Sequence, residues 1–293
     1  MNRGHREPLG PGRLVLNVSG RPGPPALRFE TTGEGGILLR QGDRPLLLGR
    51  TAGSCRDLHL HRLDGYRSPV PPLRSADQRS KANWVHRYAR WLEDADGTPL
   101  LDGRWELALR TEFPPYVWAD EFMKDWPGGR LELYCGGGWN GVLPLRRLSP
   151  PDAGRVKAYR RHAREGTLAP VLLWSVTFLD GCVILDGHDR AVAALAEGRT
   201  PECVLLSQAP DDKEWRRAAV KMAEGHEHRM RSLSDRPADP GTERQRAAME
   251  RGYADALAEL PYGLVPTRLW PLPGGARAWD DLAARAMLQF PRD

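Results

Sequence analysis

The chain has few cysteines, a small net charge and no long apolar run, and each of these features argues against a class of protein. Its 293 residues include only four cysteines, which are widely spaced and form no C-x-x-C pair. Neither a disulfide framework nor a zinc knuckle is therefore expected. No stretch approaches the roughly 18 uninterrupted apolar residues of a membrane-spanning helix, so no membrane partner is expected.

Charge of the two signs is nearly balanced. The 43 Lys and Arg residues face 38 Asp and Glu residues, which leaves a formal net charge of +5. A dedicated nucleic-acid-binding domain usually has a denser basic face, so nucleic acid is disfavoured as a partner but left open. The opening Met1–Arg6 is basic, yet no apolar segment follows it. A secretory signal is thus not expected, and the expected compartment is the cytoplasm.

Composition and periodicity divide the chain into four segments: residues 1–25, 26–140, 141–210 and 211–293. The first is rich in Gly, Pro and Arg and predicts a flexible leader. The second predicts an α+β region of unknown role, in which Gly36–Arg40 and Pro45–Gly49 form a β-hairpin. Strands and helices alternate through the third, which predicts a compact α/β unit. The fourth predicts a mainly helical extension, and the fold class expected for the whole chain is α+β.

Several helices are expected outside the α/β unit. Aromatic residues recur at helical spacing within Ser75–Leu92, which predicts a helix there. In the last segment, helices are expected over Asp211–Glu224 and Arg277–Phe290. Thr242 and Gln245 have the spacing of a capping box, which would start a further helix.

One turn in the third segment combines several groups that suit phosphate binding. A strand runs directly into Asp186 and Gly187, and an Ala-rich helix follows. The backbone N–H groups at such a helix start form a ready anion site. Gly187 lets the backbone approach a ligand closely. Arg190, in the first helical turn, can hold a phosphate through two parallel hydrogen bonds.

The other side chains of this turn offer further chemistry. Asp186 and Asp189 supply oxygen ligands of the kind that Mg²⁺ prefers, and His188 can act as an acid, a base or a phosphate contact. A purely structural role fits the same residues, because Asp commonly caps a helix and Arg190 can pair with a surface acid. Spacing alone leaves both interpretations open.

A longer pattern surrounds this turn. It consists of Leu145-Arg-Arg-Leu-Ser-Pro-Pro-Asp152, a helix, Gly166-Thr-Leu-Ala-Pro170-Val171, two strands, Asp186-Gly-His-Asp-Arg190, the Ala-rich helix and a closing strand. The stretch from Leu145 to Gln208, roughly a quarter of the chain, resembles the ParB/sulfiredoxin superfamily in this pattern. That family binds nucleotides with an Asp-Gly-His-x-Arg-type turn over the phosphates. It includes CTP-binding partition proteins, ATP-using sulfiredoxins and kinases of free serine.

The resemblance differs from member to member. His188 stands where sulfiredoxins need a cysteine, so their reductase chemistry is not expected. The free-serine kinases carry Asp-Gly-His-His-Arg, which this chain matches except that Asp189 replaces the second His. Those kinases use an acid after the first strand as the base for the substrate hydroxyl, and Asp152 occupies the comparable stretch. Partition proteins have a helix-turn-helix, but no basic recognition helix is evident after Pro210.

The resemblance implies a nucleotide-binding protein that performs Mg²⁺-dependent phosphoryl transfer to a small hydroxylated substrate, with ATP or ADP expected rather than CTP. The implied nucleotide-binding residues are those of the turn, Gly187, His188, Asp189 and Arg190. Asp186 would hold the metal or orient the substrate, His188 would contact the transferring phosphoryl group, and Asp152 would be the base. The alternatives are a non-catalytic, nucleotide-gated regulatory module and, less favoured, a DNA-binding or DNA-processing protein. The sequence does not decide whether the chain is an enzyme.

Overall fold

The structure is a computed structural model that describes residues 5–21, 23–52, 57–74, 77, 82–118, 129–131, 141–235, 239–288 and 290. Cys55 and Cys135 lie outside the described residues, whereas Cys182 and Cys203 are free thiols. The chain is a mixed α and β protein with two mixed sheets. It divides into a larger unit, Met1–Ser207 with Pro266–Asp293, and a smaller unit, Gln208–Val265. This division differs from the four predicted segments.

The strands of the predicted α/β unit belong to a seven-stranded sheet, which has the order β1-β2-β7-β12-β10-β11-β9. Its strands are β1 (His5–Pro8), β2 (Arg13–Val18), β7 (Gly103–Arg110), β9 (Val142–Pro144), β10 (Val171–Val176), β11 (Gly181–Asp186) and β12 (Cys203–Ala209). Strands from before residue 140 thus extend the sheet formed by strands after it. The predicted boundary at residue 140 therefore does not separate two folding units.

The structure corrects the expectation of a flexible leader for residues 5–18. These residues form β1 and β2, which pair with each other in antiparallel fashion. On its other edge β2 pairs with β7, from Arg13 opposite Ala108 to Val18 opposite Gly103. Leu14, Val15 and Leu16 are fully buried. The hydrophobic run is short, but the sheet completes its hydrogen bonds and removes its side chains from water.

A second, six-stranded sheet has the order β13-β3-β4-β5-β6-β8. Its strands are β3 (Leu27–Thr31), β4 (Gly36–Gln41), β5 (Arg44–Ala52), β6 (Asp57–Arg62), β8 (Gly129–Leu131) and β13 (Leu269–Pro271). The antiparallel pairing of β4 with β5 confirms the predicted hairpin. After β13, helix α7 (Gly275–Arg285) buries Trp279, whose indole N–H donates to the carbonyl of Ile37 at 2.9 Å.

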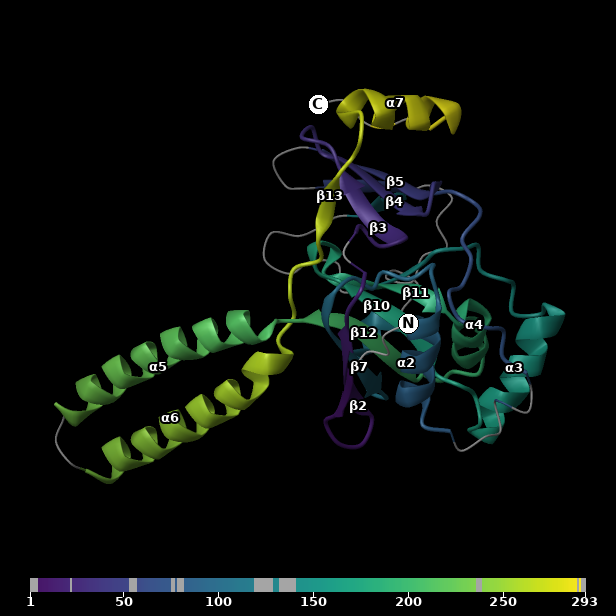
Figure 1. Cartoon of the computed structure of the whole chain (residues 1–293). Coiled ribbons are helices and arrows are strands. Elements are labelled where there is room, and N and C mark those ends of the chain that lie inside the picture. Colours follow the sequence, from purple (N-terminus) through teal and green to yellow (C-terminus); the bar gives the residue numbers. More distant parts are fainter. Residues whose placement is uncertain are drawn as a thin grey trace. The chain divides into compact units, whose positions relative to one another are not determined.

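Helices α2 (Trp84–Asp94) and α4 (His188–Ala196) of the larger unit lie beside the seven-stranded sheet in Figure 1, and α3 (Gly154–Glu165) lies next to α4. The helices predicted from the third segment are confirmed in α3 and α4. On α2, Tyr88 and Leu92 are buried in the same core as Leu14, Leu107 and Leu172 of the sheet. Short 3₁₀ turns, η1 (Pro115–Trp118) and η2 (Thr177–Leu179), connect elements of this unit.

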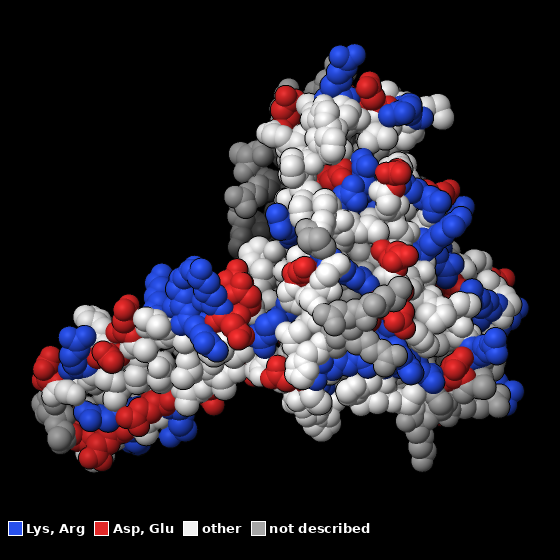
Figure 2. Space-filling model, viewed as in Figure 1, with Lys and Arg blue, Asp and Glu red and all other residues white. Residues whose placement is uncertain are grey.

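The smaller unit is a hairpin of two helices, α5 (Asp212–Ser234) and α6 (Pro240–Glu259), followed by the 3₁₀ turn η3 (Leu260–Tyr262) (Figure 1). Basic and acidic side chains lie close together along both helices (Figure 2). The predicted Thr242 capping box is wrong, because Asp239 caps α6 and Pro240 is its first residue. None of the helices among the described residues combines the length and hydrophobicity of a membrane span.

Candidate functional site

The predicted strand–turn–helix motif is present at the junction of β11 and α4. Asp186 is the last residue of β11, Gly187 precedes the helix and His188 is its first residue. Gly187 has φ +96°, a left-handed conformation that side chains disfavour. A Cβ atom added there would lie 2.6 Å from Nη2 of Arg190. Glycine is thus required both by its backbone angle and by the close approach of the arginine.

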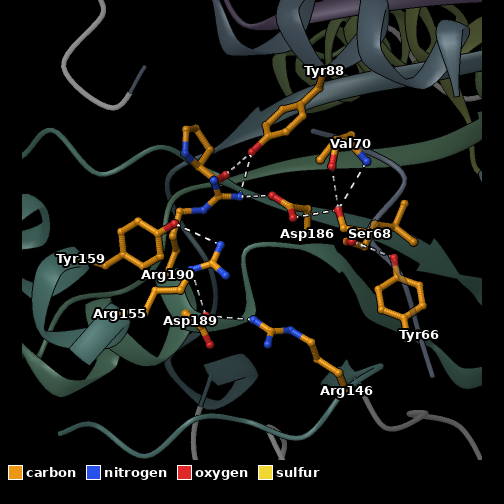
Figure 3. Close-up of polar contacts among 12 residues, drawn as sticks. Tyr66, Ser68, Val70, Tyr88, Arg146, Arg155, Tyr159, Asp186, Asp189 and Arg190 are labelled. Carbon is orange, nitrogen blue, oxygen red and sulfur yellow. Dashed lines mark hydrogen bonds and ion pairs between the residues drawn. The ribbon is translucent and has the colours of Figure 1, made fainter. Parts of the chain in front are cut away.

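An open pocket with about 280 Å³ of empty space lies at this turn (Figure 3). Its lining residues are Pro72, Leu73, Arg146, Arg155, Tyr159, Asp186, Gly187, Asp189 and Arg190. This volume includes space that is open to solvent, so the pocket is a recess in the surface and not an enclosed cavity. Four residues that the sequence assigned to the site line it together, and three charged or aromatic residues from before and within α3 join them.

Arg190 forms the inner wall of the pocket. Its side chain is only 2% exposed. Nη2 donates to Oδ2 of Asp186 at 2.6 Å and to the hydroxyl of Tyr88 at 3.0 Å. That hydroxyl donates in turn to the carbonyl of Pro170 at 2.6 Å. Nε of Arg190 is buried and has no hydrogen-bond partner among the described residues, so the pocket wall contains a guanidinium with one unused donor.

Asp186 is held from both sides. Oδ2 accepts from Arg190, and Oδ1 accepts from the hydroxyl of Ser68 at 2.8 Å. Ser68 belongs to the loop after β6, and Tyr66 fixes the start of that loop by donating to the carbonyl of Leu185 at 2.7 Å. The sequence did not predict Ser68, Tyr66 or Tyr88 as site residues. Each lies about a hundred residues from the motif that it contacts, and no local sequence pattern indicates such a contact.

Asp189 is also buried and fully engaged. Oδ1 accepts from the hydroxyl of Ser149 at 2.9 Å. Oδ2 lies 3.0 Å from Arg146 and 3.4 Å from Arg155. The two arginines expose 40% and 60% of their side chains. They form the outer rim of the pocket, where solvent can reach them.

His188 does not line the pocket. The residue is only 2% exposed, and Nε2 of its ring accepts a hydrogen bond from the backbone N–H of Leu145 at 3.1 Å. Burial, together with Arg146 and other nearby arginines, lowers the pKa of His188 well below its ordinary value. The imidazole is therefore neutral and anchors the segment after β9. The structure does not bring it to a position where it could contact a phosphoryl group in the pocket.

Asp152, the predicted base, also lies away from the pocket. It occupies an exposed turn just before α3 and is not a lining residue. The Ser149-Pro150-Pro151 stretch that precedes it instead places Ser149 against Asp189. Of the three predicted catalytic residues, only Asp186 lines the pocket.

The two carboxylates do not fit the predicted Mg²⁺ site. Each of their four oxygens already faces a donor: Ser68 and Arg190 for Asp186, Ser149 and two arginines for Asp189. A cation would have to compete with guanidinium groups for the same lone pairs. No group of three or more His, Cys, Asp or Glu residues able to hold a metal occurs in the described part of the chain.

Comparison with known proteins adds no relative: no protein-family model, curated protein or solved structure matches this chain.

Proposed function

We propose that the chain binds the phosphate groups of a small phosphorylated ligand, specifically a nucleotide, in the pocket at the start of α4. One observation carries the proposal: Arg190 is a buried guanidinium in the pocket wall whose Nε has no partner among the described residues. A buried donor left without a partner costs about 1–3 kcal/mol. Nε is closed to solvent in this structure, so a phosphate oxygen would supply the missing acceptor once the rim side chains of Arg146 and Arg155 turn outward.

The charges around the pocket support an anionic ligand. Three arginines face two aspartates, so the lining has one excess positive charge. The N-terminus of α4 adds the partial positive charge of the helix dipole. Arg146 and Arg155 are exposed enough to turn from Asp189 toward an incoming anion. Arginine also suits phosphate because its planar group can donate two parallel hydrogen bonds.

Phosphoryl transfer to a hydroxylated acceptor is the narrower form of this proposal. Asp186 would then have to accept the hydroxyl proton, since His188 and Asp152 do not line the pocket. The positions of those two residues favour the second candidate, a nucleotide-binding module without turnover. Both candidates share the same phosphate site, and the ParB/sulfiredoxin-like resemblance of residues 145–208 is compatible with either.

The test is thermal unfolding with ATP, ADP, CTP, GTP or inorganic phosphate, each with Mg²⁺ and with a chelator. A ligand at a hundred times its Kd should stabilise the protein by about 2.7 kcal/mol, or several degrees. Arg155→Ala should abolish most of this shift. The control is Arg161→Ala on the same helix, because Arg161 is 71% exposed and pairs with Glu165 outside the pocket.

Equal shifts in the two variants, or no shift with any of the ligands, would overturn the proposal and leave the turn a structural element. Where a nucleotide does bind, formation of ADP from ATP with small hydroxylated acceptors separates a kinase from a non-catalytic module. A shift that persists in the chelator is expected, because the carboxylates are already neutralised by arginines.

A further inference from the structure

The outer face of the six-stranded sheet holds a pair of opposed arginines. Phe29 and Leu39 belong to the hydrophobic core on the inner face. Successive residues of a strand point to opposite faces, so Arg28 and Arg40 lie on the outer face. They are directly opposite each other in the antiparallel pairing of β3 with β4. Like charges in this position destabilise a sheet unless another group compensates for them.

A third arginine extends this pair into a row. Strand β13 lies parallel to β3, with Trp270 opposite Glu30. Arg268 precedes this strand and is level with Arg28, and the carbon of its guanidinium lies 3.9 Å from the centroid of the Trp270 ring. Because neighbouring strands lie about 4.8 Å apart, the row crosses β13, β3 and β4 over about 10 Å. We call Arg28, Arg40, Arg268 and Trp270 the outer-face patch.

One buried carboxylate compensates for part of the charge of this patch. Glu30 is only 2% exposed and forms ion pairs with Nε of Arg28 at 2.8 Å and with Nε of Arg40 at 3.0 Å. Both pairs use Nε, and the terminal Nη1 and Nη2 of Arg40 have no hydrogen bond or ion pair with any described residue. Arg268 is exposed and forms no ion pair with a described residue either. Three positive charges thus face one negative charge, and the patch keeps an excess of two.

The immediate surroundings leave this excess in place. Asp43 and Arg44, in the turn that follows β4, carry opposite charges and cancel each other. On its other side the patch borders α7, whose Trp279 packs with Leu38 and Leu272 in a separate hydrophobic cluster. A polynucleotide is bound by a longer run of cations than this short row. A short acidic segment of a protein fits the length and the charge of the row better.

We propose that the outer-face patch is a docking surface for an acidic segment of a partner protein. Carboxylates of that segment would pair with the terminal nitrogens of Arg40 and Arg268, because a guanidinium can donate two parallel hydrogen bonds to one carboxylate. An apolar side chain beside the carboxylates would pack on Trp270, and Trp and Arg dominate the binding energy of many protein interfaces. Glu30 already holds two of the three arginines in place, so their ordering costs little when a partner binds. None of the patch residues lines the pocket at α4, so this inference is independent of the proposed function.

The experiment measures fluorescence anisotropy of a labelled peptide in which glutamates surround one leucine, at several salt concentrations. The patch variant is Arg40→Gln with Arg268→Gln. Its control removes the same charge from exposed positions of α5, Arg216→Gln with Arg217→Gln. Circular dichroism and thermal midpoints verify that the variants are folded. Arg268→Gln alone is a second variant, because Arg268 is exposed and its loss leaves both ion pairs of Glu30 intact.

The patch variant should bind the peptide about tenfold more weakly, and Arg268→Gln alone about threefold, as expected for one exposed ion pair. The α5 control should stay within about twofold of the wild type. Higher salt should weaken binding to the wild type more than binding to the patch variant. Replacing the leucine of the peptide by serine should weaken binding to the wild type but not to Trp270→Ala.

Equal losses in the patch variant and the α5 control would overturn the inference, and so would a wild type that does not bind the peptide. A single-stranded oligonucleotide that binds more tightly than the peptide, with the same loss in the patch variant, would overturn the acidic protein as the partner. It would assign the patch to nucleic acid instead. An equal effect of the leucine on the wild type and on Trp270→Ala would overturn the contact with Trp270.

Discussion

Helix α4 and the α5–α6 hairpin have similar kinds of residues but very different surroundings. Both are built of alanine and charged side chains. Seven of the nine residues of α4 are buried, including Asp189 and Arg190, whereas Leu233 is the one buried residue among the 23 of α5 and the 20 of α6. In α5, the ion pair of Arg216 with Asp212 is more than two-thirds exposed.

The difference shows that residue type does not decide what a helical charge contributes. An exposed pair is worth little, because water solvates each partner as well as the other partner does. A buried charge is stable only when it is paired or hydrogen-bonded. Removal of one partner of a buried ion pair therefore leaves the other charge buried and uncompensated. The turn before α4 should therefore be the most sensitive part of the chain to single substitutions, and the hairpin among the least.

The largest effect is expected from Arg190→Ala. It leaves Asp186 and Tyr88 without their buried partner and should lower the free energy of unfolding by about 3–5 kcal/mol. Adding Asp186→Asn should recover part of this loss, because it removes the unpaired negative charge of Asp186. Arg216→Ala on α5 should change stability by less than about 0.5 kcal/mol. Denaturant unfolding measures all three, and similar losses in Arg190→Ala and Arg216→Ala would contradict the comparison.

Gly187→Ala tests whether the backbone of the buried turn is as sensitive to substitution as its charged side chains. The new Cβ would lie 2.6 Å from Arg190 in a left-handed conformation, so a loss of about 2–4 kcal/mol is expected. Gly198 also has a positive φ, +65°, but nothing lies within 4 Å of its Cβ position. Gly198→Ala should therefore cost only about 1 kcal/mol. Thermal unfolding distinguishes the two, and equal losses would show that the arginine simply moves aside.

Acid should destabilise the buried turn through His188. Burial lowers the pKa of His188, so the unfolded chain binds its proton more readily than the folded one. Stability is then complete above about pH 6.5 and falls below it, by up to about 1.4 kcal/mol per pH unit. His188→Gln keeps an acceptor for Leu145 and should flatten this dependence. His228→Gln, at an exposed position of α5, should leave it unchanged; a flattening there would contradict the assignment.

The smallest effect is expected at the start of α5. Asp211 accepts from the N–H of Glu214 at 2.7 Å, and the Glu214 side chain accepts from the N–H of Asp211, which completes a capping box. Asp211→Ala should destabilise this end of the helix by about 1 kcal/mol. This local loss should appear as faster amide hydrogen exchange in the first turn of α5, with exchange in α4 unchanged. Asp212→Ala, which leaves the capping box intact, should have a smaller effect.

The elements confirmed from the sequence are those whose signals are local. Two apolar runs flanking a Gly-Asp tip predicted the β4–β5 hairpin, and a strand followed by Asp-Gly predicted the junction of β11 and α4. Where packing between distant residues decides, the predictions failed. The helix predicted to end at Glu224 continues to Ser234 past a glycine, and within this stretch the ring of His226 stacks on Tyr253 of α6 at 4.1 Å.

The sequence by itself determined the turn from Asp186 to Arg190, because glycine's positive φ and the helix start are properties of neighbouring residues. Only the tertiary structure decided which of those side chains a ligand can reach. It turned His188 inward onto Leu145, left Asp152 outside the pocket, and brought Ser68, Arg146 and Arg155 to the turn. The physical reason is that access and charge pairing depend on burial, and burial is settled by contacts between residues far apart in the chain.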